Sequence, residues 1–160
     1  MIALRYVYVV ALAIWVGGLL TIGSVVAPSA FAALATANRG DQAAAAVVGE
    51  VLRRFHVVGY AAGATLLATL ILMKLVGPRP PGFGLRIGLV SAMLALGVAT
   101  ATYIDPQIAA MRAEATVPIR SLAPEDPRRL RFGRLHGMST ALMAATAVCG
   151  LVLCYWETRE

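Results

Sequence analysis

Charge and cysteine are both scarce in this sequence. Only 14% of its 160 residues are charged, whereas soluble globular domains average about a quarter. The two cysteines, Cys149 and Cys154, fall on one predicted helix, where their spacing turns the sulfurs to different faces and is too long for a disulfide. We interpret them as apolar thiols that pack among other side chains. The composition therefore excludes a disulfide scaffold and argues against a soluble domain.

Apolar residues dominate the composition instead. They make up 59% of the sequence, and the mean hydropathy is +0.77. They gather in four runs, at about residues 6–26, 57–76, 87–104 and 138–156. A helix of roughly 20 residues crosses a bilayer core of about 30 Å, and lipid-exposed backbone must satisfy its own hydrogen bonds. The first run is longer than the core of a signal peptide, so we expect four retained membrane helices.

Polar helical patterns continue three of these runs on one side of the membrane. Asp41 is a candidate helix cap before residues 42–55, and Asp126 followed by Pro127 is a typical start for the last helix. Pro106 interrupts the third helix and is expected to kink it. The opposite side has only the short turn "GPRPPG". The predicted fold is an all-α, integral membrane, antiparallel four-helix bundle, with helix extensions forming a cap on one side and residues 1–160 as a single domain.

The net charge of +6 comes from basic residues between the apolar runs, which favours lipid headgroups over nucleic acid as the partner. The more basic side is expected to face the cytoplasm, placing the protein in the cell inner membrane as a multi-pass protein with both termini outside. Arg128, Arg129, Arg131 and Arg134 are candidate ligands of anionic lipid headgroups. The full set on that side is Arg39, Arg53, Arg54, Arg112, Arg120, Arg128, Arg129, Arg131 and Arg134, against Arg5, Lys74, Arg79, Arg86 and Arg159 on the other.

Three ionisable residues are predicted to share one depth at the basic edge. His56 begins the second run, Asp105 ends the third and His136 precedes the fourth. Two histidines and a carboxylate suit a divalent metal, and His56 with His136 could ligate haem axially, with Ser139 as a supporting partner. A proton relay is an alternative. Another is that each side chain only meets water or a nearby arginine at the interface.

No catalytic motif accompanies this cluster. The sequence holds no HExxH or CxxC pattern, no phosphate-binding loop and no nucleophile with a matching base, so an enzyme is not favoured. The leading hypothesis is a metal or haem site. The alternatives are a subunit of an oligomeric proton-coupled carrier or channel, and a membrane adaptor. Gly59 and Gly63 form a GxxxG motif, which we interpret as packing within the bundle rather than as a homo-oligomer contact.

The segments "AIWVGGLL", "VVAPSAF", "RRFHVVGYAAG", "YIDPQIAAMR" and "FGRLHGMST" resemble the transmembrane-protein-205-like family, a bacterial membrane domain of unknown function. The resemblance runs from about Ala13 to Ala144. It implies a four-helix membrane protein and supplies no mechanism. The matching positions include the three residues of the cluster, together with Pro106 and Ser139.

Overall fold

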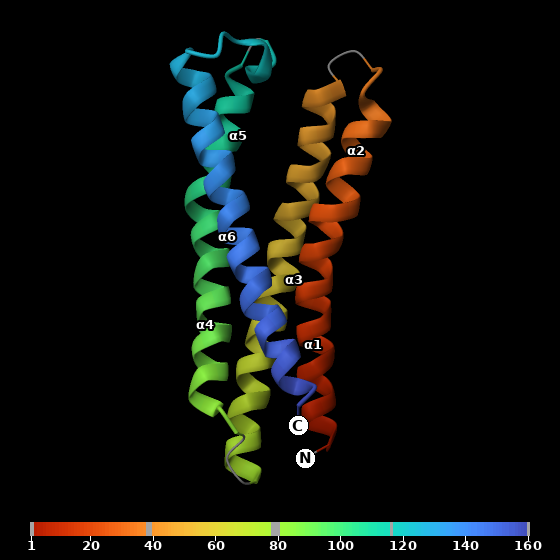
Figure 1. The fold of residues 1–160 in the computed structure, drawn as a ribbon, viewed down its shortest axis with the longest axis vertical. Helices are drawn as coiled ribbons and strands as arrows, with labels where there is room; N and C mark the ends of the chain where they lie inside the picture. The colour runs from red at the N-terminus through yellow and green to blue at the C-terminus, as the bar shows by residue number, and fades with distance from the viewer. Residues whose placement is uncertain (1, 38–39, 78–80, 116, 160) are drawn as a thin grey trace.

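Four long helices make up the protein (Figure 1). The structure is a computed structural model that describes residues 2–37, 40–77, 81–115 and 117–159; Arg39 and Arg79 of the charge count lie outside them. The first long helix joins α1 (Ile2–Thr21), the π-helical η1 (Ile22–Val26) and α2 (Ala27–Leu34). The second is α3 (Gly40–Val76). The third joins α4 (Phe83–Ala99), the π-helical η2 (Thr100–Ile104) and α5 (Asp105–Ala113), and a short 3-10 turn, η3 (Ile119–Ser121), precedes the fourth, α6 (Pro127–Glu157).

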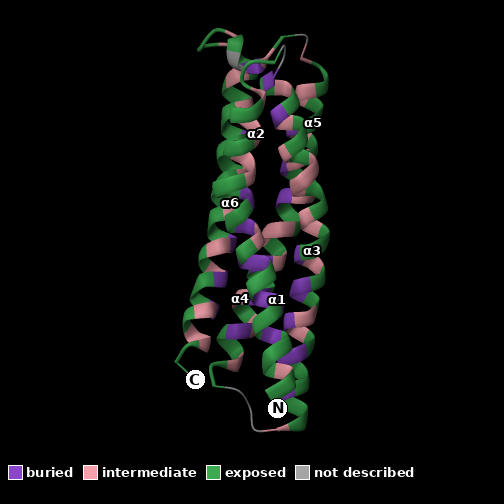
Figure 2. Cartoon of the chain, turned by 90° about the vertical axis from the view of Figure 1, so that its right-hand side faces the viewer, coloured by how far each residue is buried: buried purple, intermediate pink, exposed green. Residues whose placement is uncertain are grey.

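All four helices are long and apolar enough to cross a membrane. Each overlaps one of the apolar runs, and successive helices run antiparallel, so that both ends of the chain lie at the same end of the bundle (Figure 1). Buried side chains form a stripe along the inner faces (Figure 2). Large apolar side chains such as Leu75 and Val57 remain exposed, which is expected of a surface that contacts lipid. The chain is therefore a multi-pass integral membrane protein, and the predicted fold class is confirmed.

The first and third long helices contain a π-helical turn ahead of a proline. η1 precedes Pro28 and η2 precedes Pro106. A proline has no N–H and disturbs the backbone bonds of the turn before it, and the wider turn accommodates this change without ending the helix. The hydroxyls of Ser24 and Thr102 each bond the carbonyl four residues earlier, at 2.6 and 2.7 Å. The sequence predicted an interruption only at Pro106.

The cap follows the predicted extensions at the end opposite the termini. Asp126 caps α6 by accepting a 2.7 Å hydrogen bond from the Arg128 N–H, as expected. Asp41 instead lies inside the first turn of α3, which already begins at Gly40. Glu50 forms ion pairs with Arg53 and Arg54 on the same helix. These polar contacts of the cap are local to one helix.

Glycines bring the helices close together around Trp15. A Cβ on Gly59 would lie 3.0 Å from the Trp15 Nε1 atom, and one on Gly63 would lie 2.5 Å from Leu94 Cδ2. The GxxxG motif of α3 therefore packs against α1 and α4 inside the bundle, in agreement with the interpretation from sequence.

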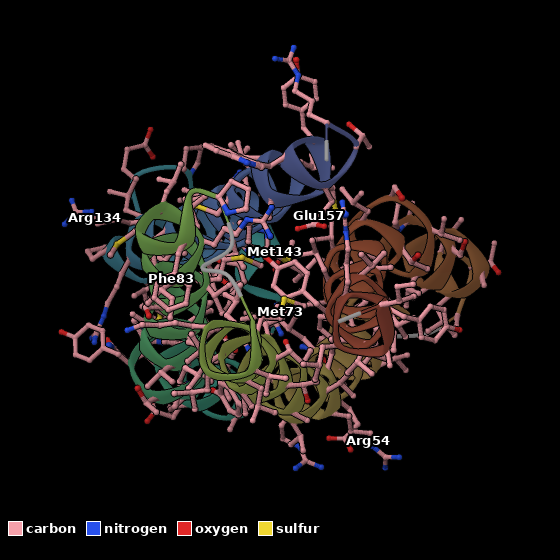
Figure 3. The ribbon with its side chains drawn as sticks, turned by 90° about the horizontal axis from the view of Figure 1, so that it is seen from below. Arg54, Met73, Phe83, Arg134, Met143 and Glu157 are labelled. Atoms are coloured by element: carbon pink, nitrogen blue, oxygen red, sulfur yellow. The ribbon has the colours of Figure 1, made fainter. Side chains whose placement is uncertain are left out.

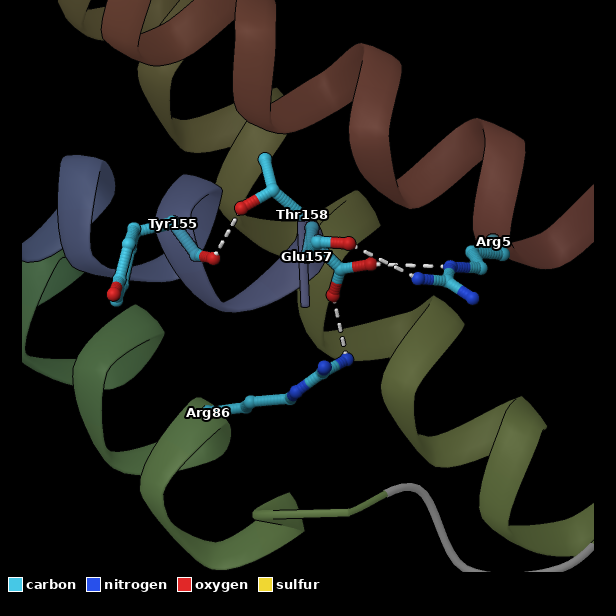
Figure 4. Close-up of polar contacts among 5 residues, drawn as sticks. All are labelled: Arg5, Arg86, Tyr155, Glu157 and Thr158. Atoms are coloured by element: carbon cyan, nitrogen blue, oxygen red, sulfur yellow. Dashed lines mark hydrogen bonds and ion pairs between the residues drawn. The ribbon is translucent and has the colours of Figure 1, made fainter. Parts of the chain in front are cut away.

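A buried ion-pair network that the sequence analysis missed ties three helices together beside the termini (Figure 4). Glu157 accepts from Arg86 Nη1 at 2.6 Å and from Arg5 Nε at 3.2 Å. The side chains of Arg86 and Glu157 are only 4% and 9% exposed. The Arg86 guanidinium also lies 5.8 Å from the centre of the Tyr8 ring. This end of the bundle is held by charge inside an otherwise apolar interior.

Replacing Glu157 with glutamine should destabilise the fold. The change keeps the side-chain size but leaves the Arg86 charge buried without its carboxylate, which typically costs about 3–5 kcal/mol. Thermal unfolding in detergent should show a clearly lower midpoint. Glu50→Gln is the matched control, because Glu50 is exposed and should tolerate the change. Equal midpoints for the two variants would contradict the role of the network.

Candidate functional site

His56 and Asp105 meet across the bundle. The His56 Nε2 atom lies 3.1 Å from Asp105 Oδ2, and the side chains are 15% and 30% exposed. His56 belongs to α3, and Asp105 is the first residue of α5, directly after the π-helical turn η2. A π-helical turn holds more residues than an α-helical one and so changes the face on which the next residues lie. The pair joins helices that are distant in sequence and sits where the polar cap meets the apolar bundle.

Tyr60 supports the His56 ring from one turn further along α3. The two rings stack with their centres 6.2 Å apart and an angle of 20° between their planes. This contact and the bond to Asp105 together define the position of the imidazole. A proton on the His56 Nε2 atom lets the imidazole donate this hydrogen bond to the Asp105 carboxylate.

An interior cavity of about 30 Å³ opens beside His56. Most of its wall is apolar, including Leu19, Phe55 and Met143. Its lining includes six side chains with polar atoms, drawn from all four long helices: Trp15, His56, Tyr60, Thr100, Ser139 and Thr146. Ligand sites between helices also have a mostly apolar wall with a few polar groups, but they enclose roughly 300–1,000 Å³. This cavity therefore has room only for a very small molecule.

The polar groups of this cavity differ in how far they are satisfied. The hydroxyls of Thr100 and Thr146 donate to carbonyls of their own helices, each at 2.9 Å, so only their lone pairs remain available. Trp15 is 4% exposed. Among the hydrogen bonds between described residues, none uses its indole N–H or the Ser139 hydroxyl. The cavity therefore presents the Trp15 N–H as a donor and the threonine lone pairs as acceptors, and the Ser139 hydroxyl can act as either.

His136 is not grouped with the other two predicted ligands. It is exposed on α6, and its ring stacks on Phe132 at 6.0 Å. The described residues contain no group of three His, Cys, Asp or Glu side chains that could hold a metal ion. The buried neighbour on α6 is Leu135, and the next residue on a helix faces about 100° away. Equal depth therefore did not ensure that the three side chains point at one another.

The remaining predicted residues take separate places. Ser139 lines the cavity, close to its expected supporting role. Arg129 donates to the Leu122 carbonyl at 2.7 Å, and Arg131 donates to the Gln107 side chain at 3.3 Å. Arg128 and Arg134 are exposed, and Arg134 points away from the bundle (Figure 3). Binding of lipid headgroups by these arginines stays a prediction.

Sequence reasoning passed over Trp15, Tyr60 and the two threonines of the cavity. For Trp15, the available signal was its position in the middle of an apolar run, away from the membrane interfaces where tryptophan is usually found. The signal for the others was weaker, because threonine and tyrosine are common in apolar helices. Only the packing of four helices places these side chains around one cavity.

Removing the Asp105 charge should alter one histidine and spare the other. In protein labelled with ¹⁵N-histidine and held in lipid nanodiscs, Asp105→Asn should shift the imidazole ¹⁵N resonances of His56, because Nε2 loses its charged partner. The resonances of His136 should change little and serve as the internal control. Spectra in which His56 is unaffected, or in which both histidines shift alike, would contradict the pairing.

Comparison with known proteins identifies the family and adds no function. Residues 10–116 match the model of a domain of unknown function, DUF4149. The match includes His56, Asp105 and the first three long helices, and it ends before α6. No curated protein matches, and no solved structure does either. Because the family model covers more than half of the sequence, the chain belongs to the DUF4149 family of membrane domains, whose function is unknown.

Proposed function

We propose that this protein is a proton-binding subunit of a membrane carrier, with His56 and Asp105 as its protonation site. The observation that carries the proposal is the 3.1 Å contact between the two side chains. Ionisable residues are costly within a membrane protein and usually serve transport or proton transfer. Histidine is also the side chain that changes charge near neutral pH.

Protonation of this pair would act on the contact between two parts of the bundle. His56 lies on α3, the second long helix, and Asp105 lies on α5, the last part of the third long helix. The Arg112 guanidinium of α5 donates to the Ala45 carbonyl of α3 at 3.3 Å, further into the cap. A proton on Asp105 removes the negative charge that faces His56, so the first of these two bridges loses its charge assistance and becomes weaker. Proton binding is thereby linked to the separation of the helices that flank the cavity.

The metal and haem hypotheses receive less support from this geometry. Structural metal sites use about four ligands, and catalytic ones use three with an open position. A metal held by His56, Asp105 and His136 would require His136 to turn inward from its exposed position. Metal analysis and a visible spectrum of the purified protein test these hypotheses directly.

Four membrane helices enclose little space, so a carrier of this size would act as a homo-oligomer. We further propose that the basic cap faces the cytoplasm, that the membrane is the inner one, and that arginines at the start of α6 contact anionic headgroups. Kinship with the transmembrane-protein-205-like family is part of the same proposal. One segment that carries this resemblance, "FGRLHGMST", lies in α6, beyond the residues that the DUF4149 model matches.

Proton movement can be measured in liposomes that contain the purified protein and a pH-sensitive dye. With an acidic exterior and a potassium potential set by valinomycin, the wild type should acidify the interior faster than protein-free liposomes do. Asp105→Asn and His56→Gln should each slow this rate at least about tenfold, which corresponds to 1.4 kcal/mol in the barrier. Glu50→Gln, an exposed carboxylate on the same helix as His56, should leave the rate unchanged.

Equal rates for wild-type and protein-free liposomes would contradict the proposal. Retention of the full rate in Asp105→Asn would also contradict it. Native mass measurement of the same preparation checks the oligomer, since a purely monomeric protein would oppose the carrier form.

A further inference from the structure

We infer that the chain is a tandem repeat of one helical hairpin and that the interior cavity, at the interface of the two repeats, is a water site. The first repeat runs from α1 to α3 and the second from α4 to α6. The inference goes beyond the proposed protonation site, because the repeat and the cavity do not depend on whether the protein carries protons.

The first helices of the two repeats share one interruption in one register. Each π-helical turn spans the five residues that end two positions before the proline, Pro28 or Pro106. Four positions before the proline, Ser24 and Thr102 each bond a carbonyl four residues earlier. Buried positions also correspond at the same separation along the chain, in the pairs Tyr8/Arg86, Leu12/Val90, Trp15/Met93 and Ile22/Thr100.

The second helices of the repeats correspond in the same way. Each carries the sequence Arg-x-His, at Arg54 to His56 and at Arg134 to His136. Arg54 and Arg134 point outward on opposite sides of the bundle when it is viewed along its long axis (Figure 3), as a two-fold axis along the membrane normal would place them. Other residues of the second helices pair at the separation of Arg54 and Arg134, which is two residues longer than that of Pro28 and Pro106. They are Gly59/Ser139, which both line the cavity, and Leu66/Thr146, Leu70/Gly150 and Met73/Leu153, which are buried.

The two halves differ at the position that carries the chemistry. Asp105 of the second repeat corresponds to Ala27 of the first, since each directly precedes the proline. His56 of the first repeat corresponds to His136 of the second. Only one of the two equivalent sites therefore holds both a histidine and a carboxylate.

Membrane proteins built from repeats place their sites at the repeat interface, next to interrupted helices. The cavity occupies this place. Trp15, His56 and Tyr60 reach it from the first repeat, and Thr100, Ser139 and Thr146 reach it from the second. Thr100 is itself the first residue of a π-helical turn.

The chemistry of the cavity selects water. Its volume of about 30 Å³ exceeds the roughly 10–15 Å³ that holds one water molecule. The buried Trp15 indole can only donate, so its partner must accept. Water can accept from Trp15 and donate to the lone pairs of Thr100, Thr146 or Ser139. The residues that line the cavity include no Asp, Glu, Lys or Arg, so an uncharged occupant is favoured.

Toward the termini, the cavity is closed by apolar packing. On α3, Leu66 and Leu70 follow the cavity toward the termini and are fully buried, together with Met93 and Leu12. These apolar side chains separate the cavity from the Arg86–Glu157 network. The cavity thus extends the surroundings of His56 inward and ends at a dry barrier.

The repeat can be tested by moving the carboxylate. In Ala27→Asp/Asp105→Ala, the imidazole ¹⁵N resonances of His136 should shift relative to those of the Asp105→Ala variant, because the new carboxylate occupies the position equivalent to Asp105. Ala27→Asp alone, which retains Asp105, is the companion if the double variant is unstable. Unchanged His136 resonances in a monodisperse protein would overturn the equivalence of the two halves.

The water site can be tested at the two tryptophans of the chain, Trp15 and Trp156. In ¹⁵N-tryptophan protein in detergent micelles, the Trp15 indole N–H should show a cross-peak to water and exchange in D₂O within hours, although the residue is 4% exposed. Trp156, near the helix end, is the exchanging reference. Ser139→Val, which fills the cavity, should slow exchange at Trp15 at least about tenfold and leave Trp156 unchanged. A Trp15 proton that persists for days in the wild type, without a water cross-peak, would overturn the water site.

Discussion

Lipid supplies no hydrogen-bond partners, and this constraint decides where polar atoms lie in the bundle. The hydroxyls of the buried threonines Thr69, Thr100 and Thr146 bond carbonyls of their own helices. Charged side chains that enter the interior do so near its ends, where they meet an opposite charge. The middle of the bundle holds mostly apolar side chains and the small cavity beside His56, so each polar group there has a structural or chemical reason to be present.

The two ends of the bundle are joined by different chemistry. Near the termini, Glu157 is held between two arginines, and arginine stays charged at any pH that a cell experiences. Near the cap, a single bond joins a histidine to a carboxylate, and both of these groups can change charge. The first arrangement suits a permanent clamp. We propose that the second opens and closes as protons bind.

Duplication of a hairpin explains why these features occur where they do. Two copies around one axis bring both proline-interrupted helices to the same depth, and the wider turns near the prolines leave room for a cavity. A symmetric pair of sites would follow if both copies carried the same residues. Because the first repeat has Ala27 at the position equivalent to Asp105, a carboxylate is present at only one of the two equivalent sites, the one next to His56.

The sequence by itself determined the four membrane helices and the helix extensions that form the cap at one end. These properties follow from local composition and from the length of helix that a bilayer requires. Only the tertiary structure decided which of His56, Asp105 and His136 meet. The rotation of each helix about its axis is set by packing, for example of Gly63 against Trp15 and Leu94, and by the π-helical turn before Asp105. That rotation turned His56 toward Asp105 and left His136 exposed, and it surrounded the cavity with side chains that no local pattern connects.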